Sequence, residues 1–189
     1  MNTSSAVRLA RVLKVLITAV FICNLITLAL VPGLSLMRTP EELLHLTPYQ
    51  NPLELPLRLA VCFLFAWRWA WEAGSYSTVL TVFLLFCGSC TAVLLWQGRR
   101  VLTTLAAAKP FRRENAENLR RAAVCCFLIA AASLVRVLWG FWFYQSIRPL
   151  LTYNALFFPI FLMGGLLCMV MSALFRQAAD LKEENDLTI

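Results

Sequence analysis

Residues 149–175 read PLLTYNALFFPIFLMGGLLCMVMSALF and contain no Asp, Glu, Lys, Arg or His. An α-helix rises 1.5 Å per residue, so roughly 20 mainly apolar residues are enough to cross the hydrocarbon core of a bilayer. Backbone amides in lipid must find their hydrogen-bond partners within the segment, which excludes irregular chain. The stretch therefore predicts a membrane-spanning helix.

Three further runs of this length and composition precede it, and they contain one charged residue between them, Arg136 in the third run. A cleavable signal is the alternative for the first run, because cations precede it. Its apolar part is longer than the usual 7 to 15 residues of a signal core, so we interpret it as an uncleaved helix. The sequence predicts four spans, over residues 14–34, 75–98, 121–143 and 152–175.

The composition of the whole chain supports a lipid environment. Of the 189 residues, 60% are hydrophobic and 14% are charged, which leaves too little polar surface to coat a soluble globule. The net charge of +7 arises from cations that flank the apolar runs, and these cations form no separate basic domain. The predicted fold class is a single-domain, all-α membrane protein built as a four-helix bundle, and no direct contact with nucleic acid is expected.

The distribution of the cations predicts the orientation. With four crossings, twelve Lys and Arg residues share one side of the membrane with both ends of the chain. The other side has only Arg38, Arg58, Arg68 and Arg148. Because cytoplasmic segments carry the excess of Lys and Arg, we predict that both termini are cytoplasmic.

The connection between the first two spans, residues 35–74, is predicted to lie outside. Its prolines favour a loop, and His45, the only histidine, has no nearby nucleophile or ligand set and is interpreted as a surface residue. Residues 57–73 contain three tryptophans, whose indole rings favour the headgroup level. We predict an interfacial helix there, with partial insertion into the bilayer as the open alternative.

The connection between the second and third spans, residues 99–120, predicts a helical hairpin. Leu, Ala and Arg residues favour a continuation of the second helix beyond the membrane, and Pro110 ends it. A new helix is expected to begin near Arg113, with acids in its first turns, where the helix dipole stabilises them. The two arms are expected to project into the cytoplasm.

The fourth helix is predicted to continue into the tail, residues 176–189, because Leu174, Ala178 and Leu181 recur at helical spacing. Four acids then cluster at its end, where the helix dipole disfavours them. A basic neighbour explains such a cluster, and the hairpin arginines would supply one. A solvated acidic tail is the alternative, because exposed ion pairs contribute little.

The hairpin and the tail also carry motifs. The hairpin contains Lys109-Pro110-Phe111, Glu114-Asn115 and Leu119-Arg120, and residues 181–189 read LKEENDLTI. In combination these motifs resemble the DUF2975 family of small bacterial multi-spanning membrane proteins of unknown function, over most of the chain from the second span onward. The family pattern has Gly and Ser where this chain has Ala108 and Arg112, and losing the serine removes a helix cap.

The resemblance implies a bacterial cytoplasmic (inner) membrane protein. Members of the family are commonly encoded beside a small Cro/CI-type helix-turn-helix regulator, which suggests a cytoplasmic partner. We therefore hypothesise a non-enzymatic protein that anchors, or signals to, such a regulator through its hairpin and acidic tail; a homo-oligomer stays open. The candidate partner-binding residues are Lys109, Pro110, Phe111, Glu114, Asn115, Arg120, Asp180, Glu183, Glu184, Asp186, Leu187 and Ile189.

Two polar residues lie inside predicted spans, Asn24 and Arg136. An intramembrane arginine is a functional candidate, although snorkelling to the nearby outer interface, or pairing with Glu72, would satisfy Arg136 structurally. The alternative function is a small transporter, or a lipid- or anion-binding membrane subunit, that uses Arg136.

No constellation for catalysis is present, since paired carboxylates, a His cluster and a nucleophile with its base are all missing. Cys87 and Cys90 form a C-x-x-C inside an uncharged run, which lacks the positive or hydrated surroundings that thiolates need. We predict no catalytic residue, no cofactor and no metal site. Gly164, Cys168 and Ser172 form a stripe of small residues, which predicts close helix packing.

Overall fold

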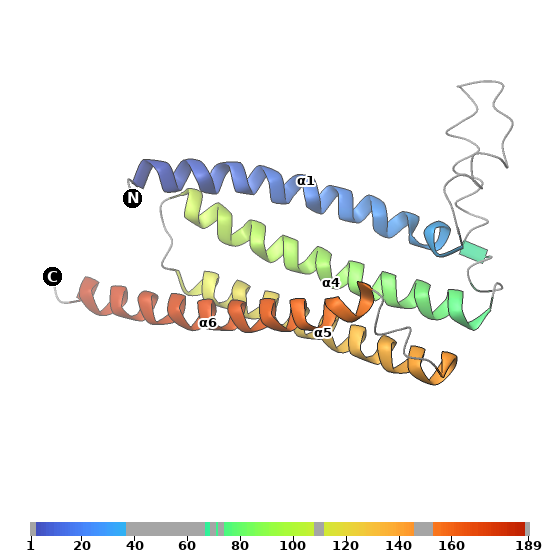
Figure 1. Cartoon of the computed structure of the whole chain (residues 1–189). Helices are drawn as coiled ribbons and strands as arrows, with labels where there is room; N and C mark the ends of the chain where they lie inside the picture. Colours follow the sequence, from blue (N-terminus) through green and yellow to red (C-terminus); the bar gives the residue numbers. More distant parts are fainter. Residues whose placement is uncertain are drawn as a thin grey trace, which may run out of the picture. The chain divides into compact units, whose positions relative to one another are not determined.

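The computed structural model describes residues 3–36, 67–68, 71, 74–107, 112–145 and 153–187. Four long helices make up nearly all of this part of the chain, and it contains no strand (Figure 1). Each helix contains a segment long and apolar enough to cross a membrane. The prediction of an all-α protein with four helices of spanning length is confirmed. The helices are α1 (Thr3–Leu36), α4 (Ser75–Ala106), α5 (Arg113–Tyr144) and α6 (Tyr153–Leu187).

The helices are longer than the predicted spans. α4 runs on to Ala106 and α5 begins at Arg113, as the hairpin sequence predicted, and α6 continues through the tail to Leu187. α1 already begins at Thr3, so the cations before the first apolar run belong to the same helix as that run. The N-cap of α5 is Arg112, which makes no side-chain capping hydrogen bond, in agreement with the missing serine.

Most of the predicted outer connection lies outside the described residues, and so do His45 and nearly all of the predicted interfacial helix at 57–73. Within that segment, residues 67–68 and 71 are helical, and the Trp67 and Trp71 side chains are exposed. Gly74 precedes α4 with φ at +112°, and its carbonyl accepts a hydrogen bond from the Thr78 N–H. The positive φ is the conformation that glycine adopts without a steric cost.

The chain divides into two compact units, which we describe separately. The second unit, Leu25–Gly88, contains a close approach between α1 and α4: a Cβ at Gly88 would lie 2.6 Å from Leu28 Cδ1. The first unit, Met1–Asn24 with Ser89–Ile189, contains the remaining contacts discussed below. In this unit the rings of Phe21 (α1) and Trp96 (α4) lie 6.0 Å apart.

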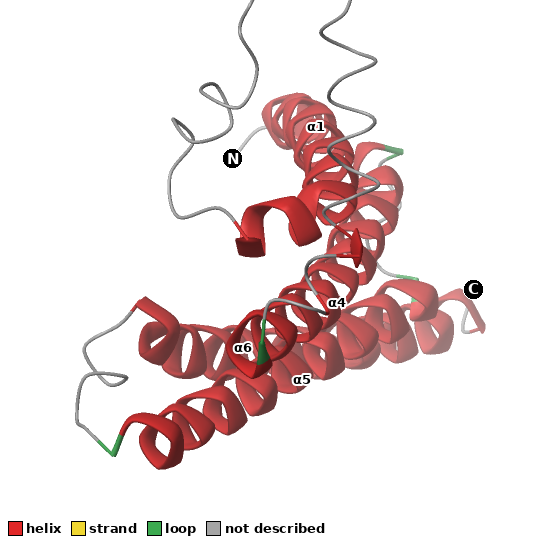
Figure 2. Cartoon of the chain, turned by 90° about the vertical axis from the view of Figure 1, so that its right-hand side faces the viewer, coloured by secondary structure: helices red, strands yellow, loops and turns green. Residues whose placement is uncertain are grey.

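The core of the first unit is centred on α5. The side chains that α5 buries are mostly small, which lets neighbouring backbones approach closely. α5 and α6 lie side by side along their lengths, and Figure 2 shows the same pair from a second direction. The buried residues of α5 include Ala116, Ala122, Ala123, Cys125, Cys126, Ile129, Ala130, Asn115, Asn118 and Ser133.

α5 and α6 are antiparallel, because residue numbers rise along α5 as those of their contacts fall along α6. The small-residue stripe of α6, for which the sequence predicted close packing without a partner helix, faces α5: the Ser172 hydroxyl donates to the Ala116 carbonyl at 2.6 Å, and a Cβ at Gly164 would lie 4.0 Å from Cys126 Sγ. The tightest approach, however, is at Gly165, where a Cβ would lie 2.8 Å from a ring carbon of Phe127. The stripe did not single out this residue.

The outer surfaces of the helices are apolar. In the most apolar part of α5, 44% of the residues are buried, against 6% in α6 and none in α1. Soluble proteins rarely expose continuous apolar surface on this scale. A hydrocarbon solvent accounts for these exposed faces, which agrees with a multi-pass membrane protein.

Candidate functional site at the charged ends of the helices

The polar residues of the predicted hairpin meet where α4 ends and α5 begins. The Thr104 hydroxyl lies 2.7 Å from the Val101 carbonyl oxygen and 2.8 Å from Asn115 Oδ1. It has one proton and donates to one of these acceptors at a time. Asn115 is fully buried, and its backbone N–H donates to the Arg112 carbonyl. The amide thus ties the start of α5 to the end of α4.

A second pair of contacts ties the start of α5 to the end of α6. Arg113 forms an ion pair with Asp180 at 3.1 Å. About two turns before Asp180 on α6, the Ser172 hydroxyl donates a hydrogen bond to the Ala116 carbonyl of α5. The Arg113 and Asp180 side chains are 60% and 42% exposed, so water screens their attraction and its contribution is small. The predicted basic neighbour of the acidic cluster is confirmed for Asp180.

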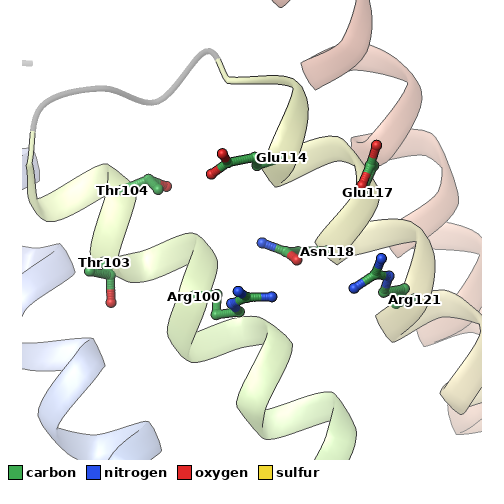
Figure 3. A pocket seen from close by; sticks show the side chains of 7 residues that line it. All are labelled: Arg100, Thr103, Thr104, Glu114, Glu117, Asn118 and Arg121. Carbon is green, nitrogen blue, oxygen red and sulfur yellow. The ribbon is translucent and has the colours of Figure 1, made fainter.

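A hollow of about 440 Å³ lies between the ends of α4 and α5; we name it the α4/α5 hollow. Two arginines and two glutamates line it, so its charges balance. In Figure 3, Thr104 and Glu114 point toward each other, as do Arg100 and Asn118, whereas Thr103 points away from α5. The lining residues are Arg100, Thr103, Thr104, Glu114, Glu117, Asn118 and Arg121.

A second hollow of about 360 Å³ lies between α5 and α6; we name it the α5/α6 hollow. Its lining has three arginines and one glutamate, so positive charge dominates. Its lining residues are Arg113, Ala116, Glu117, Arg120, Ser172 and Arg176.

The end of α6 presents an exposed surface. Leu181 is 61% exposed, and Glu183 and Glu184 follow it on the same helix and are exposed as well. Ala179, in contrast, is buried. The predicted continuation of the helix is confirmed. Of the three residues that predicted it, Leu174 and Leu181 are exposed and Ala178 is half-buried.

The structure brings several of the candidate partner-binding residues to one end of the first unit. Glu114, Arg120, Asp180, Glu183 and Glu184 are at least partly accessible there. Asn115 is fully buried, so it is not accessible to a partner, and its side chain instead contacts Thr104 of α4. Asp186 and Leu187 belong to the last turn of α6, and Lys109, Pro110, Phe111 and Ile189 lie outside the described residues.

The two intramembrane polar residues lie on different helices. Arg136 is partly exposed on α5, one turn beyond Ser133, which is fully buried. Asn24 is on α1, and its side-chain oxygen is buried without a hydrogen-bond partner in the described part of the chain. Glu72, the predicted partner of Arg136, lies outside the described residues.

The structure also places the cysteines. Cys87 is partly exposed and Cys90 is buried on α4, and no cysteine in the described ranges forms a disulfide. Among the same residues, no group of three or more His, Cys, Asp or Glu side chains has the arrangement of a metal site.

Some residues of this site were not among the sequence candidates. Thr104 and Asn118 are polar residues within helices, a weak signal that becomes specific only when α4 and α5 pack together. Arg176 was recognised only as a flanking cation. Arg176 lines the same hollow as Arg120 because of how α5 and α6 are rotated about their axes. The sequence of an apolar helix does not reveal this rotation.

Comparison with known proteins gave one result. A family model described as "Protein of unknown function (DUF2975)" matches residues 41–189. Neither the curated proteins nor the solved structures contain a match to the chain.

Proposed function

Because the chain belongs to the DUF2975 family, whose function is unknown, we propose a function from its own surface. The chain is a non-enzymatic membrane protein that holds a small cytoplasmic helix-turn-helix regulator at the membrane through the acidic end of α6. The observation that carries this proposal is the exposed surface of Leu181, Glu183 and Glu184 on a helix that is fixed against α5.

The surface is preorganised. Asp180 is paired with Arg113, Ala179 is buried, and Ser172 is hydrogen-bonded to the backbone of α5, so the exposed residues extend from a supported part of α6. Binding to a preformed helix costs less conformational entropy than binding to a flexible tail, because the tail would have to become ordered on binding. This supports α6 as a docking element.

The chemistry of the surface fits a basic partner. Helix-turn-helix proteins bind DNA phosphates with Lys and Arg, so their DNA-binding face is positively charged. Two adjacent carboxylates complement such a face, and Leu181 adds an apolar contact beside Glu184, which lies three residues further along the helix. A regulator that binds α6 through this face is kept from DNA, because both ligands use the same cations.

The proposal includes an orientation. The excess of cations beside the apolar segments supports a topology in which both termini, and therefore the end of α6, lie in the bacterial cytoplasm, the compartment of such a regulator.

The test is co-purification of the full-length protein from native membranes, with identification of bound proteins by mass spectrometry. The variant Glu183→Lys/Glu184→Lys reverses the charge of the surface and leaves the Arg113–Asp180 pair in place. We expect the wild type to retain a helix-turn-helix protein and the variant to lose it by about tenfold or more, as charge reversal at an electrostatic interface predicts.

The matched control is Glu41→Lys/Glu42→Lys, the same charge change in the predicted outer connection, and this control should retain the regulator. Equal retention by the α6 variant, or the absence of any helix-turn-helix protein from the wild-type preparation, would contradict the proposal.

A second candidate function is a small transporter or an anion-binding subunit, and it is favoured by the partly buried Arg136 within the third apolar segment. Binding of an anion to the purified protein separates the two. Under the second candidate Arg136→Leu abolishes this binding, whereas under the leading proposal the variant retains the regulator, because the substitution lies far along α5 from the end of α6. Unchanged anion binding by a folded Arg136→Leu protein would contradict the second candidate.

A further inference from the structure

The α5/α6 hollow combines a concave shape with an excess of positive charge. Its lining includes three arginines, Arg113, Arg120 and Arg176, and one glutamate, Glu117, which gives the lining a formal charge of +2. Asp180 takes up part of the Arg113 charge at 3.1 Å. Arg120 and Arg176 form no ion pair with any residue that the structure describes.

The position of these arginines along the chain places them at the membrane surface. Arg176 is the first charged residue after the uncharged run 149–175, and Arg120 and Arg121 are the last charged residues before the third apolar run. Lipid phosphates lie at the level where hydrocarbon gives way to water. Two arginines on neighbouring helices are therefore held at headgroup depth, on the rim of a hollow.

Guanidinium groups suit this location, because their planar donors match phosphate oxygens in pairs. Basic pockets between transmembrane helices are a recognised way of binding anionic headgroups. The Ser172 hydroxyl uses its one proton to donate to the Ala116 carbonyl, so it does not donate to a ligand in the hollow. The arginine side chains are therefore the donors that would bind a phosphate.

From this geometry we infer that the α5/α6 hollow binds the phosphate of an anionic phospholipid, with Arg120 and Arg176 as its principal ligands. The neighbouring α4/α5 hollow (Figure 3) is lined by two arginines and two glutamates, so we expect no such preference there. This inference does not depend on the proposed regulator, and either can fail while the other holds.

The experiment is native mass spectrometry of the full-length protein, offered equal amounts of phosphatidylglycerol and phosphatidylcholine. We expect the wild type to retain phosphatidylglycerol over phosphatidylcholine by about tenfold or more, the scale of charge-assisted hydrogen bonds. Arg120→Gln/Arg176→Gln should lose this preference. Arg120→Lys/Arg176→Lys, which keeps the charge, should retain part of it.

The matched control is Arg100→Gln/Arg121→Gln, which removes two arginines from the same end of the helices but from the balanced hollow. It should keep the wild-type preference. All four residues are at least partly exposed, so the variants are expected to fold, and circular dichroism and gel filtration check this.

Three results would overturn the inference. The wild type shows no preference between the two lipids, the control variant loses as much preference as Arg120→Gln/Arg176→Gln, or glycerol 3-phosphate at the same concentration displaces the bound phosphatidylglycerol. The last result would assign the hollow to a soluble phosphate and remove the lipid as its ligand. Retention of the lipid in the presence of glycerol 3-phosphate supports the lipid.

Discussion

At the residue scale, the contact between Gly165 and Phe127 shows how closely α5 and α6 approach. A Cβ at Gly165 would lie 2.8, 3.0 and 3.1 Å from three carbons of the aromatic ring. Adding one methyl group here forces the Phe127 ring to shift. At the neighbouring Gly164, a Cβ would lie 4.0 Å from Cys126 Sγ, which is ordinary van der Waals contact.

We predict that Gly165→Ala destabilises the protein by about 1–3 kcal/mol, the usual cost of overpacking. Thermal unfolding in detergent measures this as a lower melting temperature. Gly164→Ala is the control, and it should be neutral or stabilising by up to about 1 kcal/mol, because alanine favours the helix over glycine. Equal melting temperatures for the two variants would contradict the close approach at Gly165.

At the scale of single elements, the first turn of α5 lacks a side-chain cap. Arg112 has the extended backbone of an N-cap residue, with φ at −122° and ψ at 139°, but its side chain makes no capping hydrogen bond. Its guanidinium instead lies 3.4 Å from Glu114 in an exposed ion pair, which contributes little. The backbone of residue 112 thus has the conformation of an N-cap, but the arginine side chain accepts no hydrogen bond from the first turn of α5.

We predict that Arg112→Ser stabilises the protein by about 1 kcal/mol, because the introduced hydroxyl accepts a hydrogen bond from an N–H of the first turn. Arg112→Ala removes the same charge and adds no acceptor, so it should show no gain. Slower amide hydrogen exchange at residue 114 in the serine variant alone is the expected signature, because the N–H of residue 115 already donates to the carbonyl of residue 112. Identical exchange in both variants would show that capping does not limit this helix end.

At the scale of the whole molecule, the orientation of the four helices is the main open prediction. Single cysteines in a Cys-free variant test it by labelling with a membrane-impermeant maleimide. We expect His45→Cys to react in intact cells and Lys109→Cys to react only after the membrane is permeabilised, because the cation excess marks the cytoplasmic side. The Cys-free protein controls for background labelling, and the reverse pattern would invert the topology and remove the basis for a cytoplasmic partner.

The sequence by itself determined the class of the protein, the approximate spans and the helical extensions beyond them. These depend on local properties: an apolar run must be helical in lipid, prolines end helices, and Ala, Leu and Arg continue them. α4 therefore ends and α5 begins close to where the residues predicted. The resemblance to the DUF2975 family also came from local motifs, and the family match over residues 41–189 agrees with it.

Only the tertiary structure decided which side chains meet. The burial of Asn115, the contact of Gly165 with Phe127 and the shared hollow of Arg120 and Arg176 all depend on how each helix is rotated about its axis. In water, polar residues mark the outer face of a helix and reveal that rotation. In these spans the faces toward lipid and toward neighbouring helices are both apolar, so the sequence pattern cannot distinguish them, and packing between the helices settles the choice.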